Sequence, residues 1–255
     1  MKRSKPVQIA IALIGLLLIG LATKPSFANS RSDVRQGLPG RRISGGSRSP
    51  STACLLGSQQ QKDSQKVIAI APENNLSQTS VEHPTFWFAL PAVNPNRSIE
   101  FLLLDASEEI IYTQTVQPTG KAGLAAITLP NDAPKLSPEQ TYKWHLSVVC
   151  DRANRATDLV VWGWIERTVS QPSQPPLSSE QDDFVSYAKL TNWNDKIAAL
   201  FKLYRARMQN SQTTRDLEEE WLALLASEDL TNLLAELPIS SLASASIETA
   251  SDAGY

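Results

Sequence analysis

The sequence predicts an α+β fold, in which an antiparallel β-sandwich is followed by a small C-terminal helical domain. Short runs of β-branched and aromatic residues alternate with turn signals over residues 52–170. A Pro/Ser-rich stretch over 171–179 then interrupts the pattern. Over 180–238 the apolar residues recur with the 3.6-residue period of amphipathic helices. We therefore expect a sandwich domain, a linker and a helical domain over these three ranges, followed by a disordered tail over 239–255.

The first 28 residues have the composition of a secretory signal peptide. Three basic residues among the first five precede an apolar run over 9–21, and Ser26-Phe27-Ala28 supplies the small residues of a cleavage site. The run of about 13 to 15 apolar residues is shorter than the ~20 that span a bilayer. We expect cleavage after Ala28, with an uncleaved anchor as the alternative. The protein would then be exported to the periplasm, the thylakoid lumen or the cell exterior, with no membrane span in its mature form.

The composition excludes several classes of function. The 255-residue chain has a net charge of −2, and loss of four basic residues with the leader would leave 20 basic and 26 acidic residues, a net charge of −6. A dedicated nucleic-acid-binding protein would instead need a basic surface, so no nucleic-acid partner is expected. Two histidines and eleven glycines are too few for most multi-histidine metal sites or for a Gly-rich phosphate loop. We expect neither a metal nor a cofactor.

Residues 29–51 form an Arg/Gly-rich linker arm. Glycines and prolines interrupt any regular period here. The arm has one acidic residue, Asp33, and its arginines are Arg31, Arg35, Arg41, Arg42 and Arg48. Two interpretations stay open: an anion-binding arm, and a solvated or loosely docked segment, which we favour.

Cys54 and Cys150 are the only cysteines and are expected to form a disulfide. An oxidising compartment favours their pairing. In the chain-entropy description, closure of so long a loop would stabilise the fold by about 4–5 kcal/mol. Two buried free thiols are the alternative. A catalytic thiol is not expected, because neither cysteine belongs to a Cys-x-x-Cys pair or to a recognisable cysteine–histidine signature.

Seven short strands are expected in the sandwich. The segment 84–91 is an aromatic run with a proline at each end, and 141–150 alternates between two faces. Trp144 and Cys150 share the apolar face of that alternation, whereas Lys143 and His145 lie on the other. The expected strands are residues 67–70, 84–91, 99–104, 110–116, 122–129, 141–150 and 159–168.

Four helices are expected after the linker. Capping residues mark their beginnings, namely Ser179 with Asp182, Asn192, Thr213 with Asp216, and Ser227. Pro238 ends the last helix. The apolar stripes are expected to form core rather than to bind a partner. They comprise Phe184, Tyr187, Ala188, Ile197, Leu200, Phe201, Tyr204, Met208, Leu217, Trp221, Leu224, Leu225, Leu230, Leu233, Leu234 and Leu237.

A series of short motifs, taken in order, resembles one known family. The motifs are Pro39-Gly40-Arg41-Arg42-Ile43-Ser44-Gly45-Gly46-Ser47-Arg48, Cys54, Pro84-Thr85-Phe86-Trp87-Phe88-Ala89-Leu90-Pro91, Tyr142-Lys143-Trp144, Cys150-Asp151, Gly163-Trp164-Ile165-Glu166-Arg167, Tyr187-Ala188, Trp193 and Trp221. They resemble the cyanobacterial domain of unknown function 928 over about residues 38–238. Two departures are Ser44, where the family usually has glycine, and Thr191-Asn192-Trp193-Asn194-Asp195, where it usually has Gly-Ile-Trp-Tyr-Asp. The resemblance implies a secreted cyanobacterial protein and carries over no catalytic residue.

Few residues are candidates for catalysis, and no Gly-x-Ser-x-Gly or Ser-x-x-Lys motif is present. His145 with Ser147 could form a nucleophile–base pair. Glu166 with another acid could serve glycoside hydrolysis, and Glu108-Glu109 lies in an expected turn. We expect no catalytic residues, with a secreted hydrolase as one alternative.

Trp162 and Trp164 are the candidate ligand-binding residues. They alternate onto one face of a strand about 7 Å apart, a spacing at which two indoles could stack on successive sugar rings. The favoured alternative places both indoles in the sandwich core beside the disulfide. The sequence thus predicts an exported, non-catalytic binding or assembly module of the cell envelope. Its partner would be an envelope protein or a polysaccharide, and a carbohydrate-binding module is the second alternative.

Overall fold

The described part of the protein covers most of the predicted sandwich and helices. The computed structural model describes residues 38–44, 54–56, 66–169, 187–234, 239 and 247–248. The predicted leader with its cleavage site after Ala28, the linker over 171–179 and most of the tail over 239–255 lie outside these residues. No helix in the described ranges is long and apolar enough to cross a membrane.

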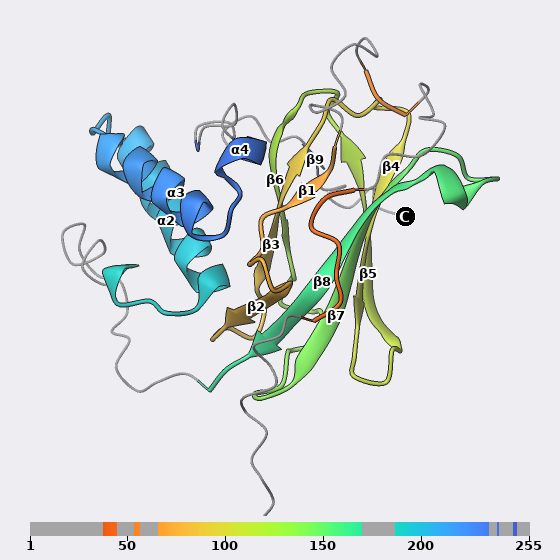
Figure 1. Ribbon diagram of the computed structural model, residues 1–255, viewed down its shortest axis with the longest axis horizontal. Coiled ribbons are helices and arrows are strands. Elements are labelled where there is room, and N and C mark those ends of the chain that lie inside the picture. Colours follow the sequence, from red (N-terminus) through yellow and green to blue (C-terminus); the bar gives the residue numbers. More distant parts are fainter. Residues whose placement is uncertain are drawn as a thin grey trace, which may run out of the picture. The chain divides into compact units, whose positions relative to one another are not determined.

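The strands assemble into two sheets. They are β1 (Ile68–Ala69), β2 (Leu76–Thr79), β3 (Thr85–Leu90), β4 (Ser98–Leu104), β5 (Ile110–Pro118), β6 (Gly123–Thr128), β7 (Thr141–Val149), β8 (Leu159–Arg167) and β9 (Ile247–Glu248), with a short 3-10 helix η3 (Arg155–Thr157) before β8. A three-stranded sheet has the order β1-β3-β6, and a six-stranded sheet has the order β2-β8-β7-β4-β5-β9. Helices α2 (Trp193–Gln209), α3 (Arg215–Ser227) and α4 (Thr231–Leu234) follow (Figure 1). The predicted α+β fold, β before α, is confirmed.

The three-stranded sheet is a middle layer with apolar contacts on both sides. Strand β3 directs Phe86 and Phe88 into a core shared with the six-stranded sheet. It directs Trp87 into a second core shared with the helices, where the indole lies 4.3 Å from the ring of Phe201, centroid to centroid. A strand buried on both faces needs apolar residues at successive positions. This explains why the aromatic run between its two prolines does not alternate with polar residues.

Two features of the six-stranded sheet differ from the sequence prediction. Strand β2 was not predicted, because its four residues include Ser77 and Gln78 and show no clear apolar alternation. It pairs with β8 in parallel, with Leu76 opposite Trp164, so the sandwich is not wholly antiparallel. The chain passes from β1 in one sheet to β2 in the other through a turn around Asn75, whose φ is 59°, and this crossing sets the direction of β2.

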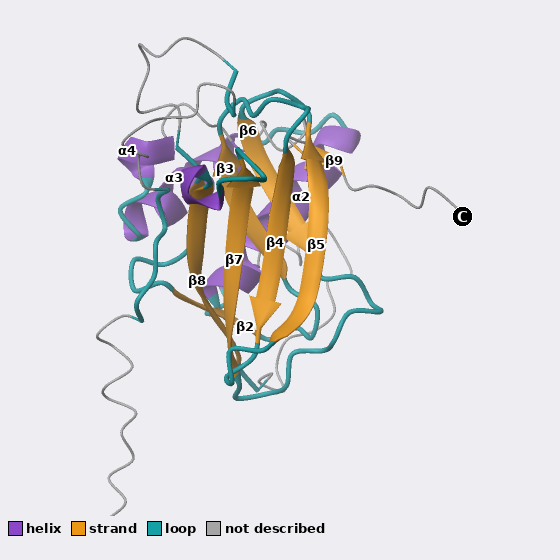
Figure 2. Ribbon diagram, turned by 90° about the vertical axis from the view of Figure 1, so that its right-hand side faces the viewer, coloured by secondary structure: helices purple, strands orange, loops and turns teal. Residues whose placement is uncertain are grey.

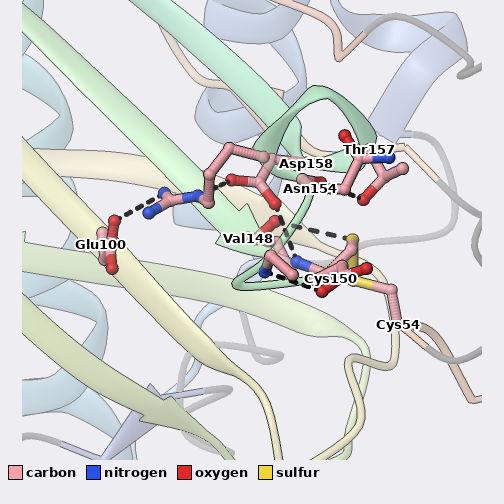
Figure 3. A network of polar contacts seen from close by, with 10 residues as sticks. Cys54, Glu100, Val148, Cys150, Asn154, Thr157 and Asp158 are labelled. Carbon is pink, nitrogen blue, oxygen red and sulfur yellow. Dashed lines mark hydrogen bonds and ion pairs between the residues drawn. A yellow bond between two sulfur atoms is a disulfide. The ribbon is translucent and has the colours of Figure 1, made fainter.

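The predicted disulfide joins Cys54 to Cys150, with 4.8 Å between the Cα atoms. Both residues are buried in the core between the sheets, as the alternation of β7 predicts. The turn that follows Cys150 is held by Asp158, whose carboxylate accepts hydrogen bonds from the Cys150 amide at 2.9 Å and from Arg155 Nε at 2.6 Å. Arg155 also reaches Glu100 on β4 at 2.7 Å (Figure 3). The disulfide is thus embedded in a network that fixes the end of β7.

The helices bury most residues of the predicted apolar stripes. All described stripe residues from Ile197 to Tyr204 and from Leu217 to Leu230 are buried. Met208 is an exception at 53% exposure, because it lies in the last turn of α2, beyond the buried part of the helix. Ala188 is a second exception, since it is exposed beside the buried Tyr187. Ser227 does not begin a helix but ends α3, where its hydroxyl donates to the Leu224 carbonyl at 2.8 Å. The proposed cap at Ser179 and Asp182, with Phe184, and the side chains of Leu233, Leu234 and Leu237 lie outside the description.

The first turn of α2 is tied to both sheets. The buried carboxylate of Asp195 accepts hydrogen bonds from the Thr79 hydroxyl at 2.6 Å and the Ser80 amide at 2.8 Å, at the end of β2. Trp193 Nε1 donates to the Ile70 carbonyl beside β1 at 3.3 Å. Asn192 is the N-cap residue, as predicted, but its side chain makes no capping bond and instead donates to Asp195 at 3.1 Å. The tryptophan and aspartate of this motif therefore hold the helix on the sheets.

Gly163 leaves space for the indole of Trp144. A Cβ atom on Gly163 would lie 2.7 Å from Trp144 Cζ2 and 3.1 Å from the main-chain oxygen of Asn75. Trp144 is itself buried between the sheets. A glycine is therefore required where β8 crosses this ring.

We predict that Gly163→Ala lowers the free energy of unfolding by about 1–3 kcal/mol, because the added methyl group overpacks the core against Trp144. Denaturant unfolding of the purified protein measures this loss. In a Trp144→Phe background the atom nearest the new methyl group is absent, so the same substitution should cost less. An equal cost in both backgrounds would show that the ring of Trp144 is not the obstacle.

We predict that replacing both Cys54 and Cys150 by alanine lowers the free energy of unfolding by up to about 4–5 kcal/mol, since 96 positions separate the two residues. Denaturant unfolding with and without dithiothreitol checks this. The reductant should destabilise the wild type by a similar amount and leave the double variant unchanged. A wild type that is indifferent to complete reduction would contradict the prediction.

Candidate functional site

The outer face of the six-stranded sheet carries the predicted tryptophan pair. Trp162 and Trp164 are partly exposed, whereas Val161 and Ile165, on either side of the pair, are completely buried. The interpretation that the two indoles fill the sandwich core is therefore wrong, because Val161, Gly163 and Ile165 take the inward positions of β8. In Figure 2 this sheet faces the viewer and the described helices lie on its far side.

The strand register brings two polar residues of β7 beside the tryptophans. Lys143 is directly opposite Trp164, and His145 is directly opposite Trp162. Side chains that face each other across antiparallel strands are near neighbours on one face of the sheet. We call the four residues Lys143, His145, Trp162 and Trp164 the aromatic face.

The side chains of the aromatic face hold one another in position. The rings of His145 and Trp162 stack with an interplanar angle of 12° and 5.8 Å between their centroids. Lys143 Nζ lies 5.1 Å from the ring centroid of Trp162 and 5.5 Å from that of Trp164, within the range of cation–π attraction. One lysine thus contacts both indoles.

The described part of the arm borders the aromatic face. Pro39 accepts a hydrogen bond from Trp164 Nε1 at 2.7 Å, and the main chain of Arg41 exchanges two bonds with that of Trp162. Ile43 then pairs with Ile68 on β1, so the segment bridges the edges of the two sheets. Residues 38–44 are therefore firmly docked rather than loosely held.

The arginine side chains of the docked arm do not converge on an anion site. Arg42 Nη1 donates to the main-chain carbonyls of Ala71 at 3.1 Å and of Glu228 at 2.7 Å, at the end of α3. A cation in this position also suits the negative end of the helix dipole. The other arginines of the arm, apart from the exposed Arg41, lie outside the described residues.

The aromatic face continues onto an aliphatic strip on β4. Leu104 is opposite Lys143 and Leu102 is opposite His145, and both leucines are partly exposed. Ile110 pairs with Leu104 from the next strand and is 56% exposed. The aromatic face and the aliphatic strip therefore lie side by side across four strands of one sheet, with the polar Lys143 and His145 of β7 between their apolar residues.

One ion pair and one hydrogen bond engage the charged groups around the aromatic face. Lys143 forms an ion pair with Glu108 at 2.9 Å, and Glu166 accepts a hydrogen bond from Gln78 at 2.9 Å. Burial lowers the pKa of His145, and the positive charge of Lys143 lowers it further against the opposing effect of Glu108. His145 is therefore neutral at neutral pH and offers both a donor and an acceptor nitrogen.

The catalytic candidates do not assemble in the described structure. His145 stacks on Trp162, and no hydrogen bond links it to Ser147 within the described chain. Glu166 is engaged with the neutral Gln78, and Glu108 with Lys143. No group of three or more His, Cys, Asp or Glu residues suited to a metal ion occurs among the residues described.

The family model described as Domain of Unknown Function (DUF928) matches residues 43–239, which include the docked arm residues Ile43 and Ser44, strands β1 to β8 and the helices α2 to α4. The chain belongs to the DUF928 family. No curated protein and no solved structure matches it.

The sequence identified part of this DUF928 site. It placed Lys143 and His145 on the polar face of one strand and the two tryptophans on one face of another, but did not place the two faces side by side. The sequence of β8 contains a signal that its tryptophans point outward. The residues that alternate with them, Val161, Gly163 and Ile165, are the smaller set, and they fit beneath Trp144. Leu102 and Leu104 on the strip were also missed, since Ile99–Leu104 is apolar at nearly every position.

We predict that the pKa of His145 lies below the ordinary histidine value of about 6.5. An NMR titration can follow its imidazole signal, which is assigned by its absence from His145→Gln. Because the unfolded state binds the proton more readily, this residue's contribution to stability is present above about pH 6.5. It is lost as the pH falls through the lowered pKa. The wild type should therefore lose more unfolding free energy between pH 7.5 and pH 5 than His145→Gln. The opposite order would contradict the assignment.

Proposed function

We propose that this DUF928 chain is a non-catalytic binding module of an exported protein, and that its aromatic face binds a neutral polysaccharide. The observation that carries the proposal is the outward placement of Trp162 and Trp164 on a sheet face that no described helix covers. Neither indole is needed to fill the core, because the other residues of β8 take its inward positions.

The chemistry of the aromatic face suits a sugar chain. Aromatic rings contact the C–H surfaces of a pyranose, whereas its hydroxyl groups need donors and acceptors nearby. The neutral imidazole of His145, the ammonium group of Lys143 and the carboxylate of Glu166 can supply those. The rings are also held before any ligand arrives, Trp164 by Pro39 and Trp162 by His145, which lowers the entropic cost of binding.

The charge pattern favours a neutral rather than an ionic polymer. Lys143 is paired with Glu108, and Arg155, in η3 before β8, is engaged by Glu100 and Asp158. An acidic polysaccharide would have to compete with these carboxylates for the cations. A basic polymer would meet Lys143 at the centre of the face.

The extracytoplasmic location rests on the leader-like first 28 residues, and the disulfide between Cys54 and Cys150 is compatible with it. The cell envelope, in a cyanobacterium as the family resemblance implies, is then the place where such a module would meet polysaccharide. An envelope protein is the other partner class, and the aliphatic strip of Leu102, Leu104 and Ile110 is the surface that it would use.

We predict that the mature chain (residues 29–255) is retarded in native gels containing soluble neutral glucans or mannans. Trp162→Ala should weaken this binding about fivefold, because loss of one stacking contact costs about 1 kcal/mol. Trp164→Phe keeps a ring but removes the donor to Pro39, so it should weaken binding less than Trp164→Ala. Thermal unfolding of every variant shows that each remains folded.

Leu102→Ala and Ile110→Ala are the matched controls on the same sheet face. They should leave glycan retention unchanged. Retention that is lost with the leucine and isoleucine variants but not with the tryptophan variants would move the site to the aliphatic strip. If no neutral or charged glycan retards the wild type, the polysaccharide proposal fails, and the protein-partner alternative takes its place.

A further inference from the structure

The edge strand β5 has a stretch of main chain without a neighbour among the described residues. It pairs with β4 along one side. On its other side β9 pairs only with Gln117 and Pro118. On that side, the amide and carbonyl groups that Tyr112–Val116 directs away from β4 at alternate residues have no strand partner among the described residues.

This stretch lacks the features that usually protect an edge. It contains Tyr112, Thr113, Gln114, Thr115 and Val116, with no charged residue, proline or glycine. Four of the five are β-branched or aromatic, the types that favour strands. The opposite edge of the sheet differs, because β2 has four residues and the arm continues its line through Arg41.

We infer that Tyr112–Val116 pairs with the same segment of a second copy of this chain, antiparallel about a two-fold axis at Gln114. In such an interface the same segment of two copies forms both strands. A charged residue within it would therefore lie close to the identical residue of the second copy and be repelled by it. An uncharged segment avoids this repulsion. The inference depends on the strand edge alone and not on the proposed polysaccharide binding.

The register follows from what lies at each end of the stretch. A β-bulge opposite Leu103 and Leu104 ends the regular pairing on one side, and β9 occupies Gln117 on the other. Centring the axis on Gln114 sets Tyr112 opposite Val116 of the second copy, and Thr113 opposite its Thr115. Residues of equal parity then share a face, as the pleat of a sheet requires. The two six-stranded sheets become one continuous sheet with two aromatic faces on the same side.

Disulfide trapping tests the register directly. Gln114→Cys places two thiols across the axis, where opposite Cβ atoms are about 4.5–5.5 Å apart. The described chain has no other free cysteine. Mild oxidation should convert most of this variant into a covalent dimer on a non-reducing gel. The matched control Gln78→Cys, on the opposite edge strand β2, should remain monomeric. Equal dimer formation by both variants, or by neither, would overturn the inference.

Sedimentation of variants without added cysteine gives a second readout. The wild type should dimerise with increasing concentration, and Thr115→Lys, at an exposed position, should weaken the association at least tenfold by placing like charges across the axis. Gln78→Lys is the control and should dimerise as the wild type does. A wild type that stays monomeric to millimolar concentration, or a dimer that tolerates Thr115→Lys, would overturn the inference. Native-gel retention by glycan, measured on monomeric Thr115→Lys, reports separately on the aromatic face.

Discussion

The middle sheet is the constraint on which the rest of this fold depends, because neither of its faces meets solvent. Strand β3 supplies Phe86 and Phe88 to the core between the sheets and Trp87 to the core beneath the helices. A helical layer must therefore be present for the middle sheet to be stable, since an uncovered Trp87 and Leu124 would leave an apolar surface in water. The sandwich and the helices share their cores and are energetically one structure.

Polar anchors reinforce this arrangement at points where the chain crosses between layers. Asp195 binds the end of β2 to the start of α2, and Arg42 binds the arm to the end of α3. Each anchor satisfies main-chain or hydroxyl groups that would otherwise be buried without partners. Among the described helices none covers the outer side of the six-stranded sheet, where Trp162 and Trp164 lie partly exposed.

The sequence predicted features that depend on local pattern and missed those that depend on which segments meet. The alternation of β7 and the turn signals predicted the strands, and the two cysteines predicted their disulfide. Strand β2 escaped prediction because Leu76–Thr79 acquires strand structure only by pairing with β8. The size of Trp162 and Trp164 favours the core as their place, and this is wrong because Trp144 on the neighbouring strand excludes any side chain larger than hydrogen at Gly163. The small residues of β8 are a local signal of this, but the ring that they accommodate lies on another strand.

The arm also sets an order on folding during synthesis. The bond from Trp164 to Pro39 joins residues 125 positions apart, and that from Arg42 to Glu228 joins residues 186 positions apart. The ribosome makes the arm early, and its partner β1 follows soon after, but its partners on β8 and at the end of α3 are made much later. Contacts between such distant residues form slowly because a long loop must close first. The contacts of the arm with β8 and with the end of α3 therefore form late, and until then the edge of β8 beside Trp162 is open to a wrong strand partner.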